Sequence, residues 1–136
     1  MKFLKKNIQN ILIYNGNVLE LFDTIKKKNI FNSIWILFPD PWKKKRHFKR
    51  RLINDYFMKK LISMVKRGGK IHIATDSQSY LRQILSNIYK FRNYFLWENQ
   101  IIDSYNFYLN KFPQTKFYKK AIKSNRKPFY IKLKKL

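Results

Sequence analysis

Short runs of apolar residues along this chain predict β-strands. The pattern is clearest in residues 34–38 and 70–74, where apolar and β-branched side chains dominate. It is weaker in residues 8–14, 94–98 and 129–133. We expect a strand in each of these segments.

Between these runs, apolar residues return every three or four positions, as they do on one face of a helix. This spacing predicts helices over residues 18–28 and 52–65, and a third that begins after a Thr, Asp or Ser cap in residues 75–77. A short helix is expected over residues 115–122. Gly68-Gly69 is expected to end the second helix, because glycine adopts the left-handed conformation that often closes helices.

Strands and helices alternate through the middle of the chain, which predicts an α/β fold. The order strand, helix, strand, helix implies right-handed crossovers and a mostly parallel sheet flanked by helices. The 136 residues are enough for one domain with a single core. Residues 101–112 are an aromatic-rich connection to which the pattern assigns no element.

The strand over residues 34–38 leads directly into Pro39-Asp40-Pro41-Trp42. The two prolines prevent a strand or helix from continuing across Asp40, so the acid is held at the carboxyl end of a strand. Open α/β sheets bind their ligands at that edge. Trp42 offers an aromatic face, and the dense cationic segment over residues 43–51 can meet phosphates. A carboxylate surrounded by Lys and Arg is suited to binding a nucleobase, or a cation, that is part of a polyanion.

The charge balance points to nucleic acid. Lys and Arg number 31 against 7 Asp and Glu, a net charge of +24. Part of the lysine content reflects a bias towards Lys, Asn, Ile, Phe and Tyr that an A/T-rich genome produces, so the clustered Arg46, Arg50 and Arg51 are better evidence. Without cysteine we expect a reducing, cytoplasmic compartment, and two unpaired histidines predict no metal site. The apolar runs are too short to span a membrane.

A longer motif carries a family resemblance. Phe38-Pro39-Asp40-Pro41-Trp42, followed by Lys44, Arg46-His47 and Lys49-Arg50-Arg51, resembles the signature of the tRNA (guanine-N7)-methyltransferase family. Ala74-Thr75-Asp76 and Thr115-Lys116-Phe117 follow in that family's order. The resemblance implies the C-terminal part of a Rossmann-like class I methyltransferase fold. It also implies S-adenosylmethionine as methyl donor, tRNA as partner, and transfer to N7 of a guanine at position 46 in the tRNA variable loop.

The resemblance also assigns roles to residues. It implies that Asp40 is catalytic and borders the cofactor, and that Asn17 touches the cofactor's adenine. The residues implied to bind substrate are Lys44, Asp76, Thr115, Lys116, Phe117 and Tyr118, the last in place of the family's acid. The residues implied to contact RNA are Arg46, His47, Phe48, Lys49, Arg50 and Arg51.

The family's glycine-rich cofactor loop has no counterpart in this sequence. We therefore expect a single, incomplete methyltransferase domain over residues 1–136, truncated at its N-terminal side and starting at what would be the third strand. In the family's sheet order two further strands lie between the strands at residues 8–14 and 34–38, so the latter is expected to have an unpaired edge. Whether a second copy or another chain completes the fold is left open.

Each assignment has a plainer alternative. Asp40 and Asn17 are also good turn residues, and Asp76 is a good helix cap. For the whole chain, the alternative to an enzyme is a non-catalytic RNA-binding remnant. A third interpretation relates Asp40-Pro41-Trp42 to the Asp-Pro-Pro-aromatic motif of amino-methylating DNA enzymes, but this chain has only one proline before the aromatic residue.

Overall fold

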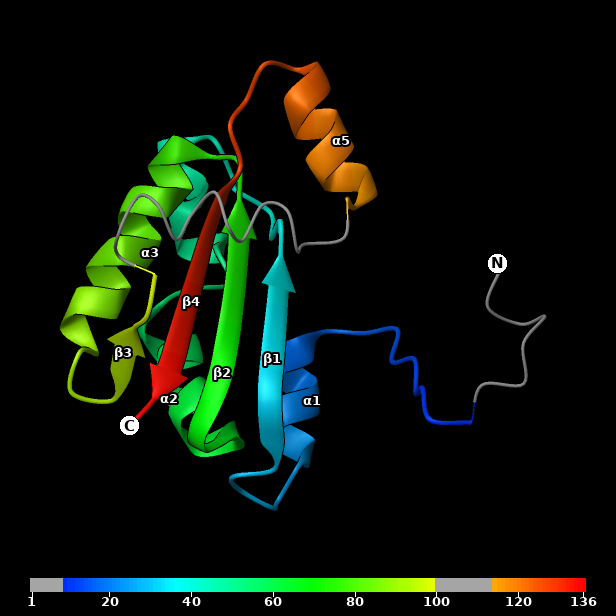
Figure 1. The fold of residues 1–136 in the computed structure, drawn as a ribbon, viewed down its shortest axis with the longest axis vertical. Coiled ribbons are helices and arrows are strands. Elements are labelled where there is room, and N and C mark those ends of the chain that lie inside the picture. The colour runs from blue at the N-terminus through cyan, green and yellow to red at the C-terminus, as the bar shows by residue number, and fades with distance from the viewer. Residues whose placement is uncertain (1–8, 100–113) are drawn as a thin grey trace.

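A four-stranded sheet with helices packed on one face forms the frame of the molecule (Figure 1). The computed structural model describes residues 9–99 and 114–136. Within these ranges the elements are α1 (Val18–Thr24), β1 (Phe31–Leu37), η2 (Lys45–Arg50), α2 (Asp55–Met64), β2 (Val65–Thr75), α3 (Gln78–Lys90), β3 (Phe95–Trp97), α5 (Lys116–Lys123) and β4 (Phe129–Lys135). In these ranges no helix has the length and apolarity needed to cross a bilayer.

The strand order is β1-β2-β4-β3. β1 and β2 are parallel, and β4 is antiparallel to both β2 and β3. Three strands therefore run the same way, but only one of the three ladders is parallel, because β4 inserts between β2 and β3. The mixed α/β, Rossmann-like class is confirmed. The prediction of a mostly parallel sheet is wrong for the ladders, since the apolar pattern of residues 129–133 carries no information about strand direction.

The core lies between this sheet and helices α1, α2 and α3. Ile71 and Ile73 of β2 are fully buried and pack in one cluster with Leu61 of α2 and Ile84 of α3. Burying each such side chain contributes roughly 1.5–3 kcal/mol. The helical apolar spacing thus identified most of the buried faces of α2 and α3, but Tyr56, which it placed on the apolar face of α2, is 49% exposed.

Gly68 and Gly69 do not end a helix, contrary to the sequence prediction. α2 ends at Met64, and β2 begins at the next residue and runs through both glycines. Opposite them the register jumps, because the pairs Phe31↔Val65 and Ser33↔Lys70 leave extra residues on β2. Gly68 has φ +75°, and a Cβ on Gly69 would lie 2.8 Å from the Lys66 carbonyl oxygen. The glycines therefore form a bulge in the strand, which requires the same conformational freedom as a helix end.

Residues 9–14 form no strand, which corrects another sequence prediction; residue 8 lies outside the described residues. The segment is irregular and exposed, with Leu12 99% and Ile13 84% accessible. It does not pair with β1, which is the edge strand of the described sheet. The expected unpaired edge on β1 is confirmed for the described residues. The connection over residues 101–112 also lies outside the described residues.

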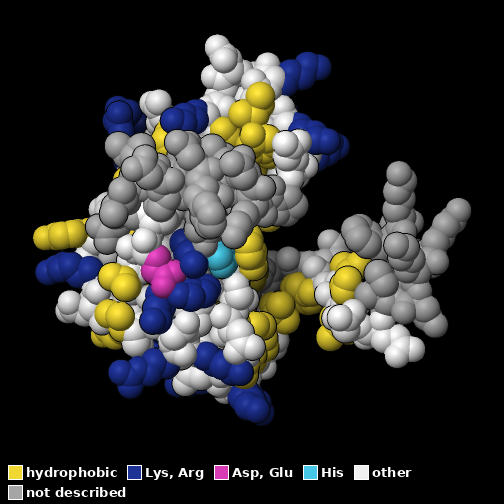
Figure 2. All heavy atoms as spheres, viewed as in Figure 1, with side chains coloured by type: hydrophobic (Ala, Val, Ile, Leu, Met, Phe, Trp, Pro, Cys, Tyr) yellow, Lys and Arg dark blue, Asp and Glu magenta, His cyan; other side chains and the backbone are white. Residues whose placement is uncertain are grey.

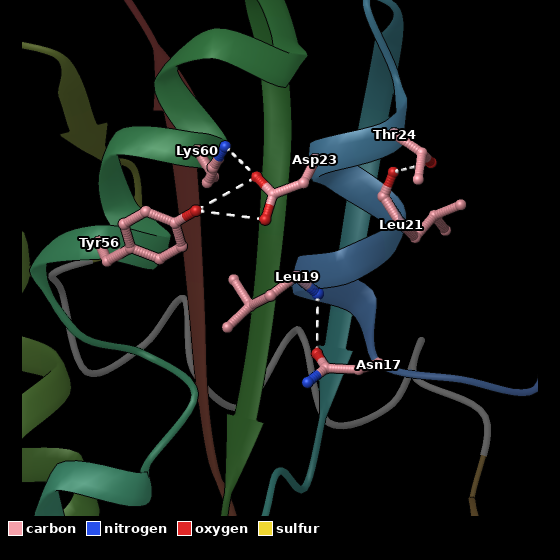
Figure 3. A network of polar contacts seen from close by, with 7 residues as sticks. All are labelled: Asn17, Leu19, Leu21, Asp23, Thr24, Tyr56 and Lys60. Atoms are coloured by element: carbon pink, nitrogen blue, oxygen red, sulfur yellow. Dashed lines mark hydrogen bonds and ion pairs between the residues drawn. The ribbon is translucent and has the colours of Figure 1, made fainter.

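A polar network fastens α1 to α2 (Figure 3). The Tyr56 hydroxyl donates to Asp23 at 3.1 and 3.3 Å, and Lys60 forms an ion pair with the same carboxylate. The hydrogen bond from Lys60 lowers the pKa of Asp23 and raises that of Lys60. The contact holds α1 in place where its apolar face meets the core through Phe22, whose ring stacks on Phe57.

His72 should make the protein less stable in mild acid. Its ring stacks on Trp35 at 3.9 Å, and burial, aided by the charge of Lys132, lowers its pKa below 6.5. The unfolded chain therefore binds a proton near pH 6.5 that the folded chain accepts only at lower pH, so stability falls as the pH drops below 6.5. We expect His72→Gln to flatten the change in urea midpoint between pH 7.5 and 5.5; an unchanged slope would contradict this.

Candidate active site

Two turns that each carry an acid meet above the carboxyl ends of β1 and β2. The parallel ladder pairs Leu37 with Ala74, and the amide of Phe38 donates to the Ala74 carbonyl at 2.8 Å. Asp40 and Asp76 therefore follow their strands at the same edge of the sheet. Both line a cavity of about 920 Å³. In Figure 1 this edge lies beneath α5.

The turn around Asp40 is strained on both sides. Phe38 has φ +52° and Trp42 has φ +42°, in the left-handed region that side chains other than glycine rarely adopt. Each such residue costs on the order of 1–3 kcal/mol and persists only where its surroundings hold it. Pro39 and Pro41 restrict the backbone between them. Strain of this kind concentrates at functional sites.

Asp40 is one of the residues that line the cavity. The residue is exposed, and it forms no hydrogen bond or ion pair with any part of the chain that the structure describes. The alternative interpretation of Asp40 as a turn-capping residue requires a hydrogen bond from its side chain to the turn, and that hydrogen bond is absent among the described residues. A carboxylate in this state can accept two N–H donors from a ligand.

Asp76 is engaged within the chain. The Nε atom of Arg126 donates to its carboxylate at 2.7 Å, and the Asp76 side chain is 21% exposed. The cap of α3 is instead Ser77, whose hydroxyl accepts from the Tyr80 amide. Sequence reasoning missed Arg126. The only signal for it was the absence of acids after residue 111, which marks the tail as basic but singles out no position.

The cavity is lined by more cations than acids. Its basic side chains are Lys43, Arg82, Lys120, Arg126 and Lys127, against Asp40 and Asp76. Figure 2 shows the same imbalance on one face of the molecule, where Lys and Arg are widely spread and acidic atoms appear in one place. A field of this sign attracts a polyanion to the cavity.

The predicted segment 115–118 contributes one residue to the cavity. Thr115 caps α5 by accepting from the Tyr118 amide at 3.1 Å, and Lys116 is exposed away from the cavity lining. Phe117 lines the cavity and stacks on Phe38 with ring centroids 6.2 Å apart. Tyr118 packs against the small cluster of Ala74 and Tyr130.

We call residues 43–51 the basic segment. The sequence predicted a loop here, and the structure contains the 3-10 helix η2. Trp42 lies beside it, with Arg50 5.1 Å over its ring and His47 edge-on at 5.8 Å, while Arg46 donates to His47 at 3.3 Å. The exposed side chains of the segment are Lys43, Lys44, Lys45, Arg46, Lys49 and Arg50.

Arg51 does not belong to that exposed surface, although the sequence placed it there. Its side chain is fully buried, with the residue 1% exposed, and its guanidinium stacks 3.5 Å over the ring of Phe48. A phosphate cannot reach it. No exposed side chain therefore supports the RNA contact predicted for Arg51, and Phe48 lies half-buried beneath it.

Asn17 lies apart from the cavity. Its side-chain oxygen accepts from the Leu19 amide at 2.9 Å and so caps α1 (Figure 3). It is not among the residues that line the cavity. The structure thus brings Asp40, Asp76 and Phe117 together but leaves Asn17 elsewhere, and a cofactor contact for Asn17 stays a prediction.

Comparison with known proteins places these motifs in a family. A family model described as putative methyltransferase matches residues 1–131. A tRNA (guanine-N(7)-)-methyltransferase of Neisseria meningitidis is 40% identical over 92 residues, covering 67% of this chain and 39% of that protein. The protein of the same name from Wolbachia pipientis is 36% identical over 128 residues, covering 94% of this chain and 54% of that protein.

The chain thus spans between about two fifths and about half of the length of these relatives. The shared region includes most of the chain in the Wolbachia comparison. The residues 1–131 that the family model matches include both acid-bearing turns and the basic segment. This chain belongs to the tRNA (guanine-N7)-methyltransferase family.

Proposed function

We propose that this chain provides the substrate side of a tRNA guanine-N7 methyltransferase, which transfers a methyl group from S-adenosylmethionine to N7 of a guanine in the tRNA variable loop. One observation supports this above the others. Asp40 has no partner within the described residues and lies in a cation-lined cavity at the carboxyl ends of two parallel strands. The names of the relatives support the choice of tRNA and of guanine N7.

The proposed chemistry requires positioning rather than proton removal. Guanine N7 is already a lone-pair nucleophile, and its attack on a methyl group needs an in-line approach. Asp40 accepts hydrogen bonds from N1–H and N2–H₂ on one edge of the guanine. N7 lies on the opposite side of the base and stays free. The same carboxylate favours the positive charge that the base acquires. Phe117 offers the base an apolar wall.

The basic segment holds the tRNA in this proposal. Its exposed Lys and Arg side chains lie directly after the Asp40 turn. An RNA backbone bound to them therefore leads into the cavity. Arg50 and His47 pack on Trp42 and are thereby ordered before RNA arrives. Contacts of this kind position a nucleic acid without reading its sequence.

The described residues do not by themselves fit a cradle for S-adenosylmethionine, which supplies an electrophilic methyl group when bound. Such cradles use glycines in a tight turn after a strand. Gly68 and Gly69 lie inside β2, and Gly16 precedes Asn17, which caps α1. We propose that further polypeptide, of the kind that the relatives contain in the rest of their length, completes the cofactor site.

Two measurements test the proposal. Isothermal titration with S-adenosylmethionine reports cofactor binding, and transfer of a labelled methyl group to tRNA reports the reaction. The expected product is 7-methylguanine in the variable loop, located by strand cleavage after reduction and aniline treatment. Methylation at another base would refute the assignment.

The non-catalytic alternative has its own supporting observation, because the basic segment is intact while the glycine cradle is missing from the described residues. It predicts tRNA binding with no heat on adding S-adenosylmethionine and no methyl transfer, even after the corresponding missing portion of a relative is supplied in trans. Transfer that appears only on that addition supports the enzymatic proposal.

A further inference from the structure

Arg51 is a buried cation whose hydrogen-bond partners within the described residues are all neutral. Its Nε atom donates to the Pro41 carbonyl at 2.7 Å, and its Nη2 atom donates to the Ser79 hydroxyl at 2.8 Å. Its Nη1 atom donates to the Gln83 side-chain oxygen at 2.9 Å and to the Ser79 carbonyl at 3.2 Å. Burying a charge without a carboxylate is costly, so a side chain retained in this state needs an explanation.

The acceptors of Arg51 come from two separate parts of the chain. Pro41 directly follows Asp40, whereas Ser79 and Gln83 belong to the first turns of α3, which directly follow Asp76. Pro41 and Ser79 both line the cavity with the two acids. Arg51 therefore joins the two acid-bearing turns from behind the cavity.

The rest of the network extends this connection on the α3 side. The Ser77 hydroxyl lies 3.3 Å from that of Ser79, and the Ser77 amide donates to Thr75 at 3.2 Å. Gln83 also donates to the Ile53 carbonyl at 3.2 Å. A shift of the guanidinium would therefore be transmitted to both residues that flank Asp76.

We propose that Arg51 is a positioning residue that fixes the spacing between the Asp40 turn and the Asp76 turn. The inference rests on the proposed function, in which those acids face the substrate. It replaces the RNA contact that the sequence suggested.

Lysine cannot take this place. A guanidinium is a planar fork with five N–H donors, and the contacts of Arg51 require three nitrogens that point in different directions. Its flat face also stacks on Phe48. An ammonium group offers its donors from one point and reaches fewer of these acceptors. A strained turn with left-handed residues on both sides of Asp40 needs such a support.

The spacing of the turns can be measured directly. The chain has no cysteine, so Lys43→Cys and Gln78→Cys allow one spin label on each turn of the full-length chain. We expect a narrow distribution of label distances that broadens in Arg51→Ala and Arg51→Lys. Gln83→Leu, which removes a single acceptor, should broaden it less. Arg67→Ala, which removes an exposed arginine at the opposite end of β2 from the Asp76 turn, should leave it unchanged.

A second readout separates positioning from a general loss of stability. With the missing portion of a relative supplied in trans, Arg51→Lys should lower the rate of methyl transfer by about 100-fold, as expected for a displaced reacting group. The tRNA affinity and its salt dependence should stay within about twofold of the wild type. The matched control is Phe57→Leu, which weakens the core at the Phe22–Phe57 stack and not at the cavity. It should keep both the rate and the narrow distance distribution below its unfolding temperature.

A narrow distribution in both Arg51 variants would overturn the inference, as would a reduced salt dependence of tRNA binding like that of Arg50→Ala. Failure of the proposed function is distinguishable. If Asp40→Asn still methylates tRNA, the role given to the acid is wrong, whereas the label distances still decide whether Arg51 joins the turns.

Discussion

Asp40→Asn should abolish nearly all methyl transfer while leaving tRNA binding intact. The substitution keeps the shape of the side chain and removes its charge and one acceptor oxygen. Because Asp40 has no partner within the described residues, the fold loses no contact there. The loss of one oriented electrostatic contact in a transition state typically costs about 100- to 1,000-fold in rate. Single-turnover transfer of a labelled methyl group, with saturating tRNA and donor and with the missing portion of a relative supplied in trans, measures this loss.

The control for Asp40→Asn is Asp55→Asn. Asp55 lies on α2 and forms an exposed ion pair with Lys90, so its loss changes the net charge equally but affects no cavity residue. We expect its methylation rate to stay within about twofold of the wild type, because exposed ion pairs contribute little to stability. Equal rates for wild type and Asp40→Asn would show that the acid plays no part in catalysis.

The sequence could predict the Asp40 turn because its causes are local. Two prolines and the end of an apolar strand place Asp40 in a turn directly after β1. The same holds for the capped start of α3 and for the apolar faces of α2 and α3. The parallel direction of β1 and β2 also followed from their order in the chain.

Arg50 and Arg51 show why the surroundings of the other site residues could not be predicted from the sequence. They are adjacent and chemically identical, yet Arg50 is exposed over Trp42 and Arg51 is buried. The difference arises from Ser79 and Gln83, which lie about thirty residues further along the chain and carry no signal of their own. The Arg126–Asp76 pair, which spans 50 residues, was missed for the same reason.

Gly68-Gly69 illustrates a different limit of prediction from sequence. A helix end and a strand bulge both require glycine's conformational freedom, so the sequence cannot separate them. The extra residues opposite β1 decide in favour of the bulge. Likewise, residues 9–14 have a strand's composition but form no strand, although the outer edge of β1 is unpaired within the described residues.

Replacing Arg46, Lys49 and Arg50 together by Ala should weaken tRNA binding more than any other surface change. Each is exposed in the basic segment next to the Asp40 turn. If each neutralises one phosphate, the slope of log affinity against log salt should fall by about 3. We expect a loss of about 10- to 100-fold in affinity near physiological salt. Filter binding or fluorescence titration over a series of salt concentrations measures both quantities.

The matched control replaces Lys26, Lys27 and Lys28 by Ala. These three lysines are equally exposed, lie together between α1 and β1, and carry the same total charge. If tRNA binding depends only on the net charge of +24, both triple variants should lose the same affinity and the same salt slope. A loss confined to the first variant locates the RNA at the basic segment, because a local phosphate contact is removed in that case only.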